Sequence, residues 1–253
     1  MSSNGKYKQL TISSHRGRWR ARAGGEPGDK EFQKIKPIVL AKDAHTCVYC
    51  GLRMEKGGKE DHAPMEVHHL DCNHEHNDPK NLVTTDHFCH AHNHIGFLGK
   101  MAVMGVIPEI SITDMNHLLR TIGVALQTGD DEMKADAREI YEILRSSSDD
   151  FSMVWGTKNP ADIGNGLLVR PKEAYEVRDV TLDGARIIFD LDSPINMQFI
   201  ERVAVRAHGL IKPNSWNDIA EEFLAENLDE WAEAGRQIAA GAMEERSKRG
   251  SDD

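Results

Sequence analysis

Cysteine and histidine gather in one short stretch of this chain. Ten of its 13 histidines lie between His45 and His94, and all four cysteines lie there too. Imidazole and thiolate are the side chains that bind zinc and related metals. Their order also indicates a metal site and not a random scatter. Cys47 and Cys50 come first, the pair His68-His69 follows, and a run from Cys89 to His94 ends the stretch. The sequence therefore predicts a metal in the middle of the chain.

Cys47 and Cys50 have the spacing of a zinc knuckle, with Gly51 able to adopt the positive φ that such a turn needs. Cys89 supplies a distant third thiolate, which predicts a structural Zn²⁺ site. Three residues compete as its fourth ligand: Asp86, which precedes Cys89 by three positions, His92, and His87. A thioredoxin-like redox pair is disfavoured because no βαβ pattern surrounds the two cysteines. The remaining cysteine, Cys72, is expected to be a free thiol.

A second set of side chains, His68, His69, Asn81, His90 and His94, resembles the pattern of HNH nucleases. That family has a ββα-metal fold in which a hairpin and a helix hold a catalytic ion. The resemblance implies that His68 and His90 bind a second divalent ion (Mg²⁺, Mn²⁺ or Zn²⁺) and that neutral His69 accepts a proton from the attacking water. It implies that Asn81 fixes the loop that orients His69, while His94 contacts the phosphate or completes the metal shell.

The net charge of −10 is unevenly distributed. Residues 1–43 carry a balance of +6, residues 44–100 carry −3, and residues 101–253 carry −13. The basic arm contains Arg16, Arg18, Arg20 and Arg22 and could contact phosphates, but a DNA duplex would repel the remainder of the chain. Strong non-specific DNA binding by the whole chain is therefore disfavoured, and the acidic part suits a basic partner segment better.

Local patterns predict the elements that must position these residues. We expect a short strand over Lys8–Ser13, a linker over 156–170, and strands or a hairpin over 177–191 with a turn at 182–184. Helices are expected over 31–43, 108–127 with a cap at Thr113, 133–146, 194–207 and 215–245. No apolar run approaches 20 residues and no secretory signal is visible, so we expect a cytoplasmic protein without direct membrane insertion.

The flanking segments resemble the IcmJ/DotN family, which are accessory components of type IVB secretion systems. The likeness extends from about Leu10 to Trp231 and is carried by LAKDAHTCVYCG, LDCNHEHNDPKNLVT, IPEISITDMNHLLRTIGVAL and WGTKNPADIGNGLL, among others. It implies a zinc-bearing, HNH-like scaffold on the cytoplasmic tail of a type IV coupling ATPase, in contact with other coupling-complex subunits and peripheral at the inner membrane through them. This chain departs from the family in having His68, His69 and His90, and in lacking a cysteine at Asp86.

Together these patterns predict an α+β fold. We expect a basic strand region (1–30), an HNH-like zinc-binding core (31–105), a mostly helical region (106–245) and a disordered tail (246–253). Two functions are consistent with this organisation. The first is an assembly scaffold in a type IV secretion or conjugation coupling complex, and the alternative is a metal-dependent HNH endonuclease or nickase that hydrolyses DNA phosphodiesters.

Overall fold

A computed structural model describes residues 7–14, 27–54 and 65–207 of the chain. The chain divides into two compact units, Met1–Leu210 and Ile211–Asp253, and every described residue belongs to the first. The predicted helix over 215–245, the tail 246–253 and the basic arm of Arg16, Arg18, Arg20 and Arg22 lie outside the described residues. Among the helices that are described, none combines the length and apolarity needed to cross a membrane.

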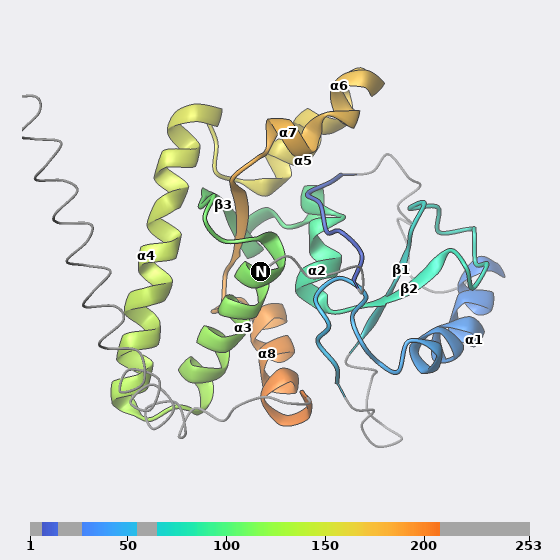
Figure 1. Cartoon of the computed structure of the whole chain (residues 1–253), viewed down its shortest axis with the longest axis horizontal. Coiled ribbons are helices and arrows are strands. Elements are labelled where there is room, and N and C mark those ends of the chain that lie inside the picture. The colour runs from blue at the N-terminus through green and yellow to red at the C-terminus, as the bar shows by residue number, and fades with distance from the viewer. Residues whose placement is uncertain (1–6, 15–26, 55–64, 208–253) are drawn as a thin grey trace, which may run out of the picture. The chain divides into compact units, whose positions relative to one another are not determined.

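The first part of the fold is a two-stranded antiparallel sheet between two helices (Figure 1). Strand β1 (Glu66–His69) pairs with β2 (Leu82–Thr85), with Glu66 opposite Thr85 and His69 opposite Leu82. Helix α2 (His87–His92) follows β2 directly. Helix α1 (Pro27–Lys42) covers β2, since the Thr84 hydroxyl donates to the Val39 carbonyl at 3.4 Å. The predicted helix over 31–43 is thus confirmed, starting four residues earlier.

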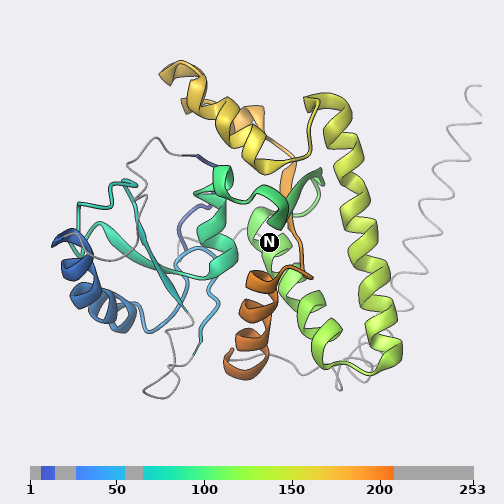
Figure 2. The same cartoon turned by 180° about the vertical axis from the view of Figure 1, so that it is seen from behind.

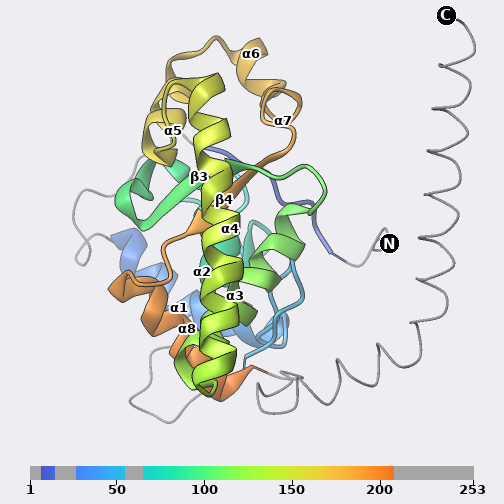
Figure 3. The ribbon, with the colours of Figure 1, turned by 90° about the vertical axis from the view of Figure 1, so that its left-hand side faces the viewer.

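The second part is built from a second antiparallel pair and the longer helices. Strand β3 (Ala102–Val106) pairs with β4 (Ala185–Phe189), although 83 residues separate Ala102 from Ala185. Helix α4 (Asp131–Trp155) packs on β3 and crosses in front of both strands in Figure 3. Helix α3 (Ile112–Thr128) packs between α4 and α8 (Pro194–Arg206), as Figure 2 shows from behind.

Short elements complete the described chain. Two 3₁₀ turns, Ile95–Phe97 and Gly99–Met101, connect α2 to β3. Three helices lie between α4 and β4: α5 (Pro160–Val169), α6 (Lys172–Glu176) and α7 (Arg178–Thr181). An aromatic contact joins the two parts of the fold, because the ring of Phe88 on α2 stacks on that of Phe189 on β4 with centroids 4.1 Å apart.

The α+β class is therefore correct, while several local predictions are wrong. Lys8–Ser13 is extended but pairs with no strand in the described chain. The cap of α3 is Ser111, whose side chain accepts from the Asp114 N–H, and not Thr113. The predicted linker over 156–170 contains helix α5, which Asn159 caps despite the local glycines. The region 177–191 holds one helix and one strand, because β4 finds its partner far away in β3 rather than in a local hairpin.

Candidate metal centre

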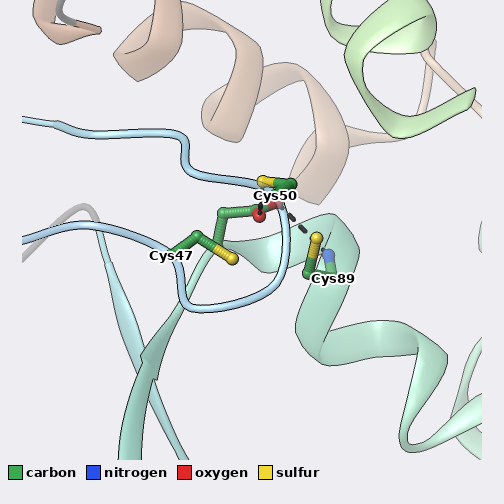
Figure 4. A group of neighbouring side chains, drawn as sticks. Cys47, Cys50 and Cys89 are labelled. Carbon is green, nitrogen blue, oxygen red and sulfur yellow. Dashed lines mark hydrogen bonds between the residues drawn. The ribbon is translucent and has the colours of Figure 1, made fainter. Parts of the chain in front are cut away.

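Three thiols and one carboxylate converge at the junction of the two parts. Cys47 and Cys50 lie in the loop after α1, Asp86 follows β2, and Cys89 lies on α2. All four are buried, and one ligand atom from each lies within 4.8 Å of the others. Figure 4 shows Cys47 and Cys50 on their loop, close to Cys89 on α2. Three thiols and a carboxylate at this spacing can hold a metal ion such as zinc.

The knuckle turn brings Cys47 and Cys50 together. The Gly51 N–H donates to the Cys47 carbonyl at 2.9 Å, and the Cys47 N–H donates to the Leu52 carbonyl at 2.8 Å. Gly51 has φ +77°, a conformation that L side chains rarely adopt. A Cβ at this position would also lie 2.6 Å from the Tyr7 hydroxyl oxygen. The positive φ therefore favours glycine here, and any side chain would also have to displace the Tyr7 ring.

Asp86 uses its two carboxylate oxygens differently. Its Oδ1 caps helix α2 by accepting from the backbone N–H groups of Phe88 at 3.0 Å and Cys89 at 3.2 Å. Its Oδ2 lies 3.1 Å from the sulfur of Cys50, inside the group of four. The cap thus fixes the carboxylate and leaves Oδ2 as a single ligand atom. Because the cap includes the N–H of Cys89, it also sets the place of that thiol relative to Asp86.

Helix α3 supplies a buried cation that the sequence did not single out. Arg120 is 3% exposed and donates from Nη1 to Asp86 Oδ1 at 3.1 Å and from Nη2 toward the Cys50 sulfur at 3.5 Å. One turn earlier, Asn116 donates from Nδ2 to the Cys89 sulfur at 3.4 Å. These donors support the ligands from outside the group, as metal sites generally require.

Burial and mutual repulsion perturb the acidity of these groups. Burial raises the pKa of Asp86 and raises that of Cys89 well above its usual value. The hydrogen bond with Cys47 raises the pKa of Cys50, and the charge of Asp86 acts in the same direction. A divalent cation would reverse this balance by stabilising the anionic ligands. With a dication bound, three thiolates and one carboxylate leave two negative charges, of which Arg120 offsets one.

Of the three candidates for the fourth position, only Asp86 lies with the thiols. His92 is buried on α2 with its Nδ1 2.8 Å from the Phe88 carbonyl, and burial lowers its pKa to about 4. The Nδ1 of His87 lies 2.9 Å from a Glu66 oxygen, and its Nε2 faces Asn196. The prediction that His92 belongs to the thiolate group is therefore corrected. Asp86 holds that position instead, because its role as the cap of α2 turns its carboxylate inward.

His68, His90 and His94 form a second group, whose ligand atoms also lie within 4.8 Å of one another. His68 is buried at the end of β1, while His90 and His94 are half-buried, so this group lies nearer the surface than the thiols. Their ring centroids are 4.9 to 5.5 Å apart in edge-on arrangements. Three imidazoles in this arrangement can hold a divalent ion and leave a further position open.

Glu66, which the sequence did not suggest, braces this second group. One of its oxygens contacts His90 Nδ1 and the other lies 2.9 Å from His87 Nδ1. Burial would raise the pKa of Glu66, but hydrogen bonds from these two histidines hold it well below its usual value. An ionised carboxylate on Nδ1 leaves the opposite ring nitrogen of His90 to face the group, an arrangement common in metal sites.

His69 lies beside this group and not in it. Its Nε2 is 3.0 Å from the Asn77 amide oxygen, which can only accept, so Nε2 carries a proton. Its ring stacks on Phe32 of α1 and contacts the ring of His74, with centroids 5.3 and 5.0 Å apart. Asn77 and Phe32 of α1 thus fix the orientation of the His69 ring.

Asn81 holds the loop between β1 and β2. Its side-chain oxygen accepts from the Asp71 N–H at 3.1 Å, and its Nδ2 donates to Asp71 Oδ1 at 2.8 Å and to the His76 carbonyl at 2.9 Å. Asn81 thus has the loop-fixing contacts expected of it and touches no member of either group. Cys72 is buried in the same loop with its sulfur 4.0 Å from His68 Nε2, away from the other thiols.

Comparison of the chain with protein-family models and with curated proteins gave no match. Function is therefore inferred from the two groups of side chains and the elements that hold them.

Proposed function

We propose that this chain is an accessory subunit of a type IV secretion or conjugation coupling complex, in which it acts as a zinc-stabilised scaffold. The observation that carries this proposal is that the Cys47–Cys50–Asp86–Cys89 group is closed to solvent. All four ligands are buried, and Arg120 and Asn116 occupy the space behind them. A metal held there has no open position for a substrate, so its role is to hold the structure together.

The place of this centre also supports a scaffold. Its ligands come from the knuckle, the end of β2 and α2, and its supporting donors come from α3. A zinc ion bound there would fasten the long helices to an HNH-like ββα module formed by β1, β2 and α2. The resemblance to the IcmJ/DotN family suggests the cytoplasmic tail of a coupling ATPase as the partner, which would place the chain at the inner membrane through that partner.

The test is co-purification of the zinc-loaded chain with a coupling-ATPase tail encoded beside it. Cys89→Ser should lose the zinc and the complex together, whereas Cys72→Ser, a buried cysteine outside the group, should keep both. Metal content by mass spectrometry and complex formation by gel filtration give the two readouts. Retention of zinc by Cys89→Ser would contradict the assignment of the site, and a wild-type chain that never binds the tail would contradict the scaffold.

A second candidate function is supported by the convergence of His68, His90 and His94. A divalent ion held by these side chains would polarise a phosphodiester. His69, held by Asn77 through Nε2, would accept a proton from the attacking water at Nδ1. Asn81 would keep the loop in place, and His94 would serve either the ion or the phosphate. These roles are those of an HNH endonuclease or nickase acting on DNA.

Nicking of supercoiled plasmid with Mg²⁺ or Mn²⁺ separates the two candidates. A nuclease should convert the plasmid, and His69→Ala and His90→Ala should each abolish the conversion while leaving zinc bound at the cysteine group. His76→Ala is the matched control, since His76 lies in the same loop, is exposed and pairs with Asp71 at 2.6 Å. Equal background conversion by the wild type and all three variants would eliminate the nuclease hypothesis and leave the scaffold as the remaining candidate.

A further inference from the structure

The extended segment Lys8–Ser13 is held at both ends by the rest of the fold. The Lys8 N–H donates to the Val48 carbonyl at 2.8 Å, and the Ser13 N–H donates to the His92 carbonyl at 2.8 Å. Between these anchors, Leu10 and Ile12 are buried, with 7% and 3% of their surface exposed. Thr11 between them is half-buried and Ser13 is buried as well, so the segment enters the core from Leu10 onward.

The middle of this segment nevertheless lacks a strand partner. Over the described ranges, no backbone N–H or carbonyl of Gln9, Leu10, Thr11 or Ile12 takes part in a hydrogen bond. The only hydrogen bond here involves a side chain, since Arg178 donates from Nη2 to the Thr11 hydroxyl at 3.2 Å. Unpaired backbone groups in an extended, anchored segment are a ready template for another strand. Four residues offer an edge about 13 Å long.

A groove runs along this edge. Two adjoining cavities, of about 230 and 500 Å³, share four lining residues, Gln9, Leu10, Ser111 and Ile112. The groove therefore lies between the extended segment and the start of α3. An added strand placed there would meet the unpaired backbone on one side and the first turn of α3 on the other.

The charges of the groove indicate the chemistry of its occupant. One end is lined by Asp179 and Asp183, both exposed. Arg186 lies at the same end but is buried, and its guanidinium donates to the carbonyls of Ile110, Ala185 and Pro108. Arg178, which contacts Thr11, does not line this cavity, so the exposed charges of its described lining are those of Asp179 and Asp183. The other end carries Lys8 as its one charged lining residue among those described. A basic residue fits the Asp179–Asp183 end.

We propose that Gln9–Ile12 is a docking edge for an extended peptide that carries lysine or arginine. The peptide pairs with this edge as an added strand, and its basic side chain lies against Asp179 and Asp183. Main-chain hydrogen bonds supply affinity in this mode, and the charged end supplies selectivity and orientation. Because the edge is already extended and anchored, little conformational entropy is lost on binding. This inference goes beyond the scaffold role and stands without it.

The probe is a fluorescein-labelled decapeptide of alternating valine and lysine, acetylated and amidated, added to the full zinc-loaded chain. Two matched peptides accompany it, one with alternate backbone amides N-methylated and one with glutamate in place of lysine. We expect the first peptide to bind and each of the others to bind at least about tenfold more weakly by fluorescence anisotropy. Equal binding of the N-methylated peptide, or no binding of the lysine peptide, would overturn the docking edge.

Variants of the chain test the charged end. Asp179→Lys with Asp183→Lys should weaken binding by at least about tenfold. Glu139→Lys with Glu142→Lys makes the same charge change on the exposed face of α4, away from the groove, and should leave binding unchanged. Hydrogen exchange gives the direct readout, since amides of Gln9–Ile12 should exchange more slowly with peptide bound. Unchanged exchange there would contradict the proposal, whatever the coupling-ATPase tail does.

Discussion

Arg120 on helix α3 and Asp86 at the end of β2 form a fully buried ion pair, with Nη1 3.1 Å from Oδ1. The side chains are 3% and 0% exposed. The pair connects the long helices to the candidate metal centre, because the same carboxylate caps α2 and reaches the Cys50 sulfur with its other oxygen. Removal of one partner would leave an uncompensated charge in the interior, which costs far more than the pair itself contributes.

Arg120→Ala should therefore destabilise the zinc-loaded chain by about 3–5 kcal/mol, measured by urea unfolding. Arg138→Ala is the matched control, because Arg138 pairs with Asp192 at 3.1 Å where both side chains are exposed. That pair should contribute about 1 kcal/mol or less. Similar losses of stability in the two variants would mean that the buried pair matters no more to the free energy of unfolding than an exposed one.

The sequence predicts the thiolate ligands but not the residues behind them. The Cys47-x-x-Cys50 spacing and the position of Cys89 are local signals, whereas the hairpin and helix that carry His68 and His90 were expected only from the resemblance to HNH nucleases. Asp86 could be chosen over His92 only once its capping role was visible. Arg120 and Asn116 come from an ordinary amphipathic helix, where a buried arginine and a surface arginine look alike in sequence.

Long-range pairing explains the errors in the fold. β4 has β-branched residues, which favour a strand, but its partner β3 lies 83 residues earlier, counted from Ala102 to Ala185, and no local pattern specifies that register. Helix α5 contains Gly164 and Gly166, which lower helix propensity. Gly164 is required by packing, since a Cβ there would lie 2.7 Å from the backbone of Gly96. Tertiary contact therefore overrides the local preference for a loop.

Two glycines should respond oppositely to alanine. Gly51→Ala forces a side chain into the left-handed region at φ +77° and toward the Tyr7 hydroxyl, so we expect a loss of about 1–2 kcal/mol and weaker zinc retention. Gly166→Ala lies on helix α5 with no atom within 4 Å of the added Cβ and should gain about 0.5–1 kcal/mol. Thermal unfolding measures both. A neutral Gly51→Ala would show that the knuckle turn tolerates strain.

Glu66→Gln should weaken the second metal group without touching the first. The amide keeps one acceptor but loses the charge that orients His90, so the affinity of the histidine group for Mn²⁺ or Co²⁺ should fall about 10- to 100-fold. Calorimetric titration of the zinc-loaded chain gives this value. Glu75→Gln, an exposed carboxylate in the neighbouring loop, is the control and should bind as the wild type does. Unchanged affinity in Glu66→Gln would mean that the carboxylate does not support a ligand.

Tyr141 makes stability depend on alkaline pH. Its hydroxyl is buried, donates to the Phe189 carbonyl at 2.9 Å and accepts from the Leu191 N–H at 3.1 Å. Burial raises the pKa of Tyr141 above its usual value, so the folded state favours the neutral phenol. As the pH rises above about 10, the unfolded chain loses this proton first and is stabilised by the loss. The contribution of Tyr141 is thus complete below about pH 10 and decreases above it.

Tyr141→Phe should cost about 1–3 kcal/mol near neutral pH, because the Phe189 carbonyl and the Leu191 N–H each lose a buried partner. As the pH rises above about 10, the wild type should lose stability faster than the variant, so the difference between them should narrow. Urea unfolding of both proteins across this range isolates the effect, because all other titrating groups are common to the two chains. Parallel stability curves would show that the phenol does not ionise on unfolding, and a widening difference would reverse the sign of the pKa shift.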